Sequence, residues 1–298
     1  MFRKRETITQ NIAYMALMAS INVIFVLLTY FVPFLIFLLV FILPFTSVVV
    51  TLFCEKKYLP IYLLATIGLC LIVTIHNFSD TLFYVIPALL SGTLFGLMVE
   101  KKIPSIWIIF VSTLLTTGLS YAFVPLIEFI YQQNIIEVFL KIFQVDGFVY
   151  IYYAVPCFIF LISLIQSVLS YAFIKAELPK LGFEVTEDGN QWFVILGGLL
   201  SASLTVLFIF VFPTLSYFFS LWIIYFACHI LIDLILSKRT LNYILLGVSV
   251  IVVFVLFGTL YSYIDVPFGF LLIDILFILI ICDGIVDNYF KSNRTKVE

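Results

Sequence analysis

Charged residues are scarce in this chain. Of its 298 residues, 11% are charged and 64% are hydrophobic, and the mean hydropathy is +1.25. Soluble domains are about one quarter charged and about one half apolar. The balance therefore excludes an ordinary water-soluble fold and favours a chain that crosses a lipid bilayer. The net charge of -2 and the pI near 5.7, without a long basic tract, give no reason to expect nucleic acid as a partner.

Histidine and paired cysteines are nearly absent as well. The two histidines, His76 and His229, belong to no HExxH pattern, and no GxSxG pattern occurs. The sequence therefore predicts no metal site, no cofactor and no serine-type catalytic centre. The five cysteines are scattered and form no CxxC pair, which is typical of small apolar filling residues. A membrane enzyme is the function class that these absences favour least.

Long apolar runs are what the chain has in abundance. A helix rises about 1.5 Å per residue, so about 20 apolar residues cross the hydrocarbon core of a bilayer. We therefore predict an all-α fold, a polytopic transmembrane helical bundle of about ten spans. The predicted spans are 11–31, 34–53, 58–75, 81–99, 105–127, 149–174, 192–212, 214–236, 241–262 and 267–288.

Lysine and arginine indicate how these spans are oriented. Basic residues resist translocation and collect in short cytoplasmic loops. If the chain crosses ten times, 14 of the 15 basic residues fall on one side, and Lys141 is the exception. We therefore expect both termini to be cytoplasmic, in a multi-pass protein of the bacterial cytoplasmic membrane.

A polar inner connection at 175–191 divides the predicted spans into two groups. It contains proline and glycine residues that break helices and a mildly acidic end. The predicted organisation is a six-span membrane region at 1–174, this cytoplasmic loop, a four-span region at 192–290 and a cytoplasmic tail at 291–298.

An outer connection begins at Glu128 and has a short amphipathic pattern. Glu137 and Lys141 are four residues apart on its polar stripe. This segment is predicted to lie on the outer surface, either as a lid over an outward-facing cavity or as a covering linker.

Small residues at helical spacing predict close helix contacts. Gly92 and Gly96 form a GxxxG pattern in the fourth span, and Ala16 and Ser20 form a small-xxx-small pair in the first. Such faces let helix backbones approach closely in lipid. The Ala16 and Ser20 face has two interpretations, packing within the chain and docking to another membrane subunit.

The sequence "HILID" places His229 and Asp233 one helical turn apart near the cytoplasmic end of the eighth span. One interpretation is a structural pair whose side chains reach toward the inner surface, and the other is a proton or ligand site.

Three acids interrupt the last apolar run. Asp283 and Asp287 are one turn apart near the cytoplasmic end, with Lys291 one turn further, which is typical of anchoring groups that reach water. Asp274 is nine residues from Asp283, on about the opposite face, and about 10 Å from the outer end of the span. A carboxylate that faces lipid at such depth is costly, so Asp274 should face the bundle or a wet cavity, or be protonated. We interpret it either as a ligand or proton site or as a hydrogen-bonded packing residue.

Three segments carry a resemblance to known proteins: "NIAYMALMASINVIFVLL" from Asn11, "YVIPALLSGTLFGLMVEKK" from Tyr84 and the closing "IICDGIVDNYFKSNR". Through these segments the chain resembles the YybS-like family of bacterial membrane proteins. More distantly, the first six spans resemble the substrate-binding S components of energy-coupling factor transporters. That resemblance implies a six-helix solute-binding region that docks to a membrane coupling subunit with ATPases through a small-residue face. Ala16 and Ser20 occupy the matching positions, and no ligand residues carry over.

The expected function is therefore related to transport. We expect an S-component-like subunit that binds a small or partly apolar solute from outside. The alternatives are a non-transporting membrane scaffold, or a secondary transporter with two inverted five-span halves.

Overall fold

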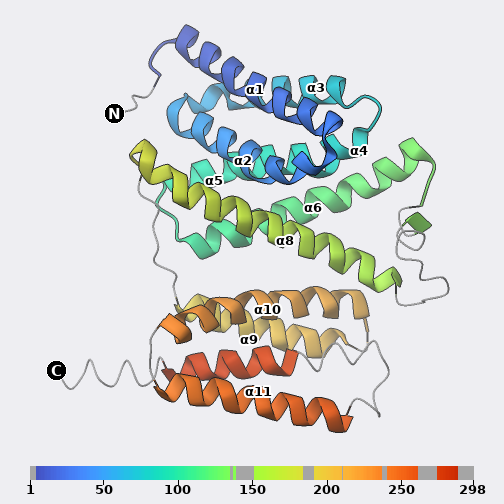
Figure 1. Ribbon diagram of the computed structural model, residues 1–298, viewed down its shortest axis with the longest axis vertical. Coiled ribbons are helices and arrows are strands. Elements are labelled where there is room, and N and C mark those ends of the chain that lie inside the picture. Colours follow the sequence, from blue (N-terminus) through green and yellow to red (C-terminus); the bar gives the residue numbers. More distant parts are fainter. Residues whose placement is uncertain are drawn as a thin grey trace. The chain divides into compact units, whose positions relative to one another are not determined.

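The computed structural model describes residues 5–134, 137–138, 151–183, 191–209, 211–236, 240–260 and 274–287. Contacts divide the chain into two compact units. Unit 1 comprises 1–146 and 158–188, and unit 2 comprises 147–157 and 189–298. The described part of the chain contains helices and no strands, so the all-α fold is confirmed (Figure 1).

Unit 1 consists mainly of long helices, and the connections between α1, α2, α3, α5 and α6 are short (Figure 1). Its elements are α1 (Ile8–Phe31), α2 (Ile36–Phe53), α3 (Leu59–Val73), α4 (Phe78–Asp80), α5 (Ile86–Glu100), α6 (Ser105–Tyr131) and α8 (Ile151–Glu177), the last from Phe158 onward. The π-helical turn Thr81–Val85 joins α4 to α5. Short 3₁₀ turns at Pro33–Leu35, Lys56–Tyr58 and Leu178–Leu181 complete the unit.

Unit 2 contains α9 (Gln191–Phe208), α10 (Pro213–Leu236), α11 (Thr240–Leu260) and a helix over 274–287. Glycines bring these helices close together. A Cβ atom at Gly197 would lie 2.6 Å from the ring of Phe226, and one at Gly284 would lie 2.5 Å from Ile230. The helices of this unit therefore pack through small residues against large apolar side chains.

Seven helices of the described residues are long and apolar enough to cross a membrane. They are Ile8–Phe31, Ile36–Phe53, Lys56–Val73, Phe78–Glu100, Ser105–Tyr131, Val155–Leu181 and Thr214–Leu231, and Trp192–Phe208 and Asn242–Val252 are shorter apolar helices. The chain is thus a multi-pass membrane protein by the length and composition of its helices. The count of ten spans and the cytoplasmic termini stay predictions, because seven described helices qualify as spans and helix length and composition do not indicate the side of the membrane.

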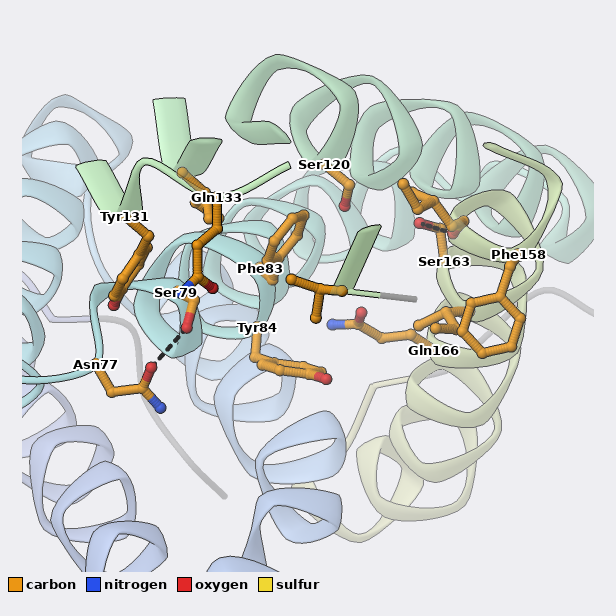
Figure 2. Close-up of a pocket in the computed structure, with 14 residues that line it drawn as sticks. Asn77, Ser79, Phe83, Tyr84, Ser120, Tyr131, Gln133, Phe158, Ser163 and Gln166 are labelled. Atoms are coloured by element: carbon orange, nitrogen blue, oxygen red, sulfur yellow. Dashed lines mark hydrogen bonds between the residues drawn. The ribbon is translucent and has the colours of Figure 1, made fainter. Parts of the chain in front are cut away.

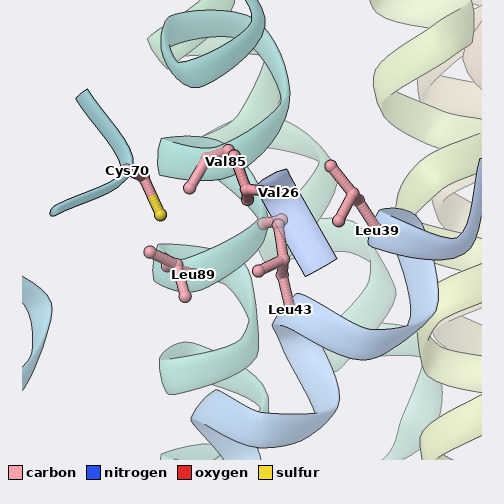
Figure 3. Packing of buried hydrophobic residues seen from close by; sticks show 7 residues of the cluster. Val26, Leu39, Leu43, Cys70, Val85 and Leu89 are labelled. Atoms are coloured by element: carbon pink, nitrogen blue, oxygen red, sulfur yellow. The ribbon is translucent and has the colours of Figure 1, made fainter. Parts of the chain in front are cut away.

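An apolar cluster joins the first helices of unit 1 (Figure 3). Its buried members are Val26, Leu39, Leu43, Cys70, Val85, Ala88 and Leu89. They come from α1, α2, α3, α5 and the π-helical turn. Aliphatic side chains pack here on every side, as expected where helix association depends on van der Waals contact.

Buried amides and hydroxyls also join these helices. Asn22 on α1 donates from Nδ2 to the Tyr62 hydroxyl at 2.9 Å and accepts from the Thr46 hydroxyl at 2.7 Å. The three side chains are buried and come from α1, α3 and α2. Because lipid offers no hydrogen-bonding alternative, such polar groups are satisfied between helices, which fixes how the helices meet.

A proline in α2 creates another bond between helices. Pro44 has no N–H, so the carbonyl of Val40 lacks its intrahelical donor. The Ser170 hydroxyl of α8 donates to that carbonyl at 2.7 Å. A side chain from a neighbouring helix therefore satisfies the backbone group that the proline leaves free.

Candidate functional site

A pocket of about 460 Å³ lies between three segments of unit 1 (Figure 2). It is formed by the start of the helix that begins at Phe78, the second half of α6 and the residues of α8 from Phe158 onward. The described lining residues are Asn77, Ser79, Phe83, Tyr84, Ser120, Ile127, Tyr131, Gln133, Val138, Phe158, Ile159, Ile162, Ser163 and Gln166. This size and position between helices are typical of small-molecule sites.

The π-helical turn positions two of the aromatic walls. The Ile86 N–H bonds to the carbonyl of Thr81, five residues earlier, which widens this turn of the helix. Phe83 and Tyr84 both line the pocket from this turn (Figure 2). Thr81 is held by a buried 2.6 Å hydrogen bond to the Thr74 hydroxyl of the preceding segment. The wide turn is thus anchored on the side away from the pocket.

Local hydrogen bonds order the segment before α4. The Ser79 hydroxyl donates to Asn77 Oδ1 at 2.6 Å, and Asn77 Nδ2 donates to the Asp80 carboxylate at 2.7 Å. Asn77 and Ser79 line the pocket, whereas Asp80 does not. The carboxylate of Asp80 thus accepts a hydrogen bond within its own turn and is not part of the pocket wall.

Gln166 provides a polar group that remains available inside the pocket. Its side chain is 7% exposed, and its Nε2 has no hydrogen-bond partner among the described residues. Figure 2 shows the amide reaching from α8 toward Phe83 and Tyr84. A buried amide without a partner costs about 1–3 kcal/mol. The pocket therefore favours an occupant that accepts a hydrogen bond.

None of the described lining residues carries a charge. The polar contribution comes from amides and hydroxyls, and the rest of the wall is aromatic or aliphatic. A charged occupant would lose its hydration on entering the pocket and would find no counter-charge among the described lining residues. This desolvation is costly in a low dielectric. The wall therefore suits an uncharged, partly apolar molecule.

Polar side chains continue beyond the pocket along the same helix faces. On α6, Thr113 and Thr117 precede the lining residue Ser120 at the spacing of one helix face. On α8, Ser167 follows Gln166. The hydroxyls of Thr113, Thr117 and Ser167 are buried without a hydrogen-bond partner among the described residues. The interior next to the pocket is thus polar enough to hold water.

The pocket lies at the end of the helix Phe78–Glu100 that is away from the lysine pairs Lys56–Lys57 and Lys101–Lys102. It surrounds the first turns of the helix Phe78–Glu100, whereas Lys101 and Lys102 follow its last residue. At about 1.5 Å per residue the two ends are roughly 30 Å apart. Lys56 lies at the basic end too, where its Nζ is 2.6 Å from a carboxylate oxygen of Glu100.

Asp274 of unit 2 is 3% exposed and accepts a 2.6 Å hydrogen bond from the Ser220 hydroxyl of α10. Asp283 accepts from the Ser249 hydroxyl of α11 at 3.2 Å. These acids thus contact different helices. The function of Asp274 stays a prediction.

Asp283 and Asp287 are buried, which differs from the interpretation that they reach water as anchors. Asp287 accepts a 3.2 Å hydrogen bond from Asn242 Nδ2 of α11. Hydroxyl and amide groups of α11 therefore donate hydrogen bonds to these two acids, for which the sequence suggested contact with water. Lys291 lies outside the described residues.

The predicted pair on α10 is described in part. His229 is half-buried, and its ring lies 4.9 Å from that of Tyr225. The Asp233 side chain lies outside the described part of the chain, so the pairing of His229 with Asp233 stays a prediction.

The small-residue faces are placed differently from one another. Gly92 and Gly96 pack against α2, where a Cβ atom at Gly92 would lie 2.3 Å from the Pro44 carbonyl oxygen. Ala16 and Ser20 are exposed on α1, and the Ser20 hydroxyl donates to the Ala16 carbonyl at 2.9 Å. Packing of the Ala16 and Ser20 face within the chain therefore finds no support among the described residues, and docking stays a prediction.

The pocket residues were not anticipated from the sequence. Gln166 carried the available signal, because it is a lone amide within the apolar run "FLISLIQSVL". The predicted outer segment touches the pocket through Tyr131, Gln133 and Val138. Residues 135–136 and 139–150, including Lys141, lie outside the described residues, so the choice between lid and linker stays open.

No protein-family model, curated protein or solved structure matches this chain. The resemblances to the YybS-like family and to S components therefore remain predictions from the sequence, and the candidate site rests on the geometry of unit 1 alone.

Proposed function

We propose that the protein binds a small, uncharged, partly apolar solute in the pocket of unit 1, as an S-component-like subunit of the bacterial cytoplasmic membrane. The observation that carries this proposal is a cavity whose described lining is aromatic, aliphatic and uncharged, and in which Gln166 Nε2 has no hydrogen-bond partner among the described residues. An acceptor on the solute, such as a carbonyl or ring nitrogen, takes the hydrogen bond that Gln166 offers. Phe83, Tyr84 and Phe158 supply flat apolar contact area.

The proposed orientation places the pocket toward the outside. Ten spans with cytoplasmic termini put the basic pairs on the inner surface. The pocket surrounds the opposite end of the helix Phe78–Glu100, so it faces the outer surface in that orientation. Solute then enters from outside, and a membrane coupling subunit with ATPases supplies the energy for its transfer.

A thermal-shift screen of the purified full chain with neutral metabolites tests the pocket. We expect a stabilising solute to raise the melting temperature of the wild type. Ser120→Phe fills the pocket and should abolish this shift, and Gln166→Leu should weaken it at least tenfold in solute concentration, because a hydrogen bond in an apolar site is lost.

Ser203→Phe is the matched control, because Ser203 is an exposed serine of unit 2 and should leave the shift unchanged. A solute whose stabilising effect survives Ser120→Phe binds elsewhere and contradicts the proposal. A screen in which no neutral metabolite stabilises the wild type contradicts it as well.

A further inference from the structure

Unit 2 buries a carboxyl group that the proposed solute site does not use. Asp274 stands at the start of the described helix 274–287 and is 3% exposed. Its Oδ1 accepts the 2.6 Å hydrogen bond from Ser220, and its Oδ2 has no hydrogen-bond partner among the described residues. One carboxyl oxygen is thus satisfied and the other is not.

The described surroundings offer this group no counter-charge. The sequence of unit 2 has no Lys or Arg in 192–236 or in 241–290. An ionised carboxylate in such a place is paired, bound to a cation or neutralised by a proton, because an isolated buried charge is too costly. A hard cation such as Mg²⁺ or Ca²⁺ needs about six or more oxygen ligands, whereas the described contacts of Asp274 supply only its own oxygens and the Ser220 hydroxyl. The proton is the ligand that fits this site.

The described helices α9, α10 and α11 of unit 2 carry few other titratable groups. α9 has none, and α11 contributes Tyr243. Asp283 is nine residues from Asp274, about half a turn around the helix, where it bonds to α11. His229 is nine residues from Ser220, on about the opposite face of α10. Tyr217, Tyr225, Cys228 and Asp233 are the remaining titratable residues of α10.

We propose that Asp274 and Ser220 form a proton-binding site of unit 2, in which Asp274 is held as the neutral acid at neutral pH. The Ser220 hydroxyl donates to the carbonyl oxygen of the acid, which leaves the proton on Oδ2. Oδ2 is the atom that has no other partner, so it is also the atom from which the proton is exchanged. Unit 2 thus takes up or releases one proton although 192–236 and 241–290 contain no Lys or Arg.

Infrared spectroscopy of the full chain tests this proposal, because a protonated carboxyl has a C=O stretching band that a carboxylate lacks. At neutral pH we expect such a band in the wild type and its loss in Asp274→Asn, which keeps the size and hydrogen bonding of the side chain. Asp283→Asn is the matched control on the opposite face of the same helix, and it should keep the band.

A second variant gives a result that does not depend on removing the acid. In Ser220→Ala the donor to the carbonyl oxygen is gone, so the band should persist and move to higher frequency. The proposal is overturned if the wild type and Asp274→Asn have the same spectrum in the protonated-carboxyl region at neutral pH. It is equally overturned if the band is present but is unmoved by Ser220→Ala.

Discussion

The two units bury different kinds of polar group. In unit 1 the buried polar side chains of the described residues are amides and hydroxyls, such as Asn22, Thr46 and Gln166. In unit 2 the buried set includes the carboxyl groups of Asp274, Asp283 and Asp287. The set of unit 1 lies in helices long and apolar enough to cross a bilayer, where a neutral amide costs far less to bury than an ion.

This difference indicates different ligands. An interior of amides and hydroxyls orients a neutral molecule through single hydrogen bonds, and the pocket beside Gln166 has this character. An interior with acids and no basic residues stays stable by binding protons or by surrounding each acid with donors. Asp283 and Asp287 accept hydrogen bonds from side chains of α11, whereas one oxygen of Asp274 has no partner among the described residues.

The units also differ in what their glycines pack against. In unit 1 a Cβ atom at Gly92 would meet backbone atoms of Pro44, at 2.3 Å for the carbonyl oxygen. In unit 2 a Cβ atom at Gly284 would meet the Ile230 side chain at 2.5 Å. A side chain can turn aside, but the backbone of a helix has to move as a whole. The approach of α2 to α5 is therefore the less tolerant of the two contacts.

The largest expected effect is that of Gly92→Ala. The new methyl group forces α5 away from α2, so we expect a loss of about 3 kcal/mol or more in the free energy of unfolding. Gly284→Ala should cost less, about 1–2 kcal/mol, because Ile230 can shift. Unfolding of each purified variant in detergent, followed by tryptophan fluorescence, measures the differences.

Gly68→Ala is the control for both variants, since nothing lies within 4 Å of its Cβ position. It should leave stability unchanged or slightly higher, as expected for alanine in place of glycine in a helix. Equal losses for Gly92→Ala and Gly284→Ala would contradict the distinction between backbone and side-chain contacts.

An intermediate effect is expected at Ser170, whose hydroxyl satisfies the Val40 carbonyl that Pro44 leaves free. Ser170→Ala leaves this carbonyl buried without a donor, so it should cost about 1–3 kcal/mol. In a Pro44→Ala background the backbone N–H returns, and the same substitution should cost less than half as much. A double-mutant cycle of unfolding free energies measures the coupling.

Ser203→Ala is the matched control for that cycle. Its hydroxyl bonds to the Leu199 carbonyl of its own helix at 2.9 Å and is exposed. Its loss should change stability by less than about 0.5 kcal/mol. If Ser170→Ala costs the same with and without Pro44, its hydroxyl does not replace the missing helix donor.

The fold class could be predicted from the sequence because it depends on composition and the lengths of apolar runs. The close approach of α5 to α2 also has a local signal, the spacing of Gly92 and Gly96. The pocket could not be predicted in this way. It depends on how the π-helical turn Thr81–Val85, α6 and α8 meet, and a π-helical turn has no residue pattern that distinguishes it from ordinary helix.

The hydrogen-bond donors to the three buried acids could not be predicted from the sequence either. The sequence indicated that Asp274 needs a polar neighbour. It did not indicate which of the serines of unit 2 is the donor, and the structure shows that it is Ser220 of α10. The same limit applies to Asp283 and Asp287, where proximity to Lys291 in the sequence suggested water and a cation. In the structure the donors are instead distant in sequence: Ser249 lies 34 residues from Asp283, and Asn242 lies 45 residues from Asp287. Helix packing brings them together.

The smallest effect on stability is expected for Ala16→Leu, which compares the exposed face of α1 with its buried face. Ala16 is exposed, whereas Ala19 on the same helix is 5% exposed and packs in a cluster with Met15 and Val50. Ala16→Leu should change the free energy of unfolding by less than about 0.5 kcal/mol, and Ala19→Leu should cost about 1–3 kcal/mol through overpacking. If the Ala16 face docks to a coupling subunit, affinity purification of Ala16→Leu from native membranes should lose that subunit and its ATPases while the folded protein is recovered in full. A loss of stability in Ala16→Leu as large as in Ala19→Leu would instead show that Ala16 packs within the chain, and would remove this face as a docking surface.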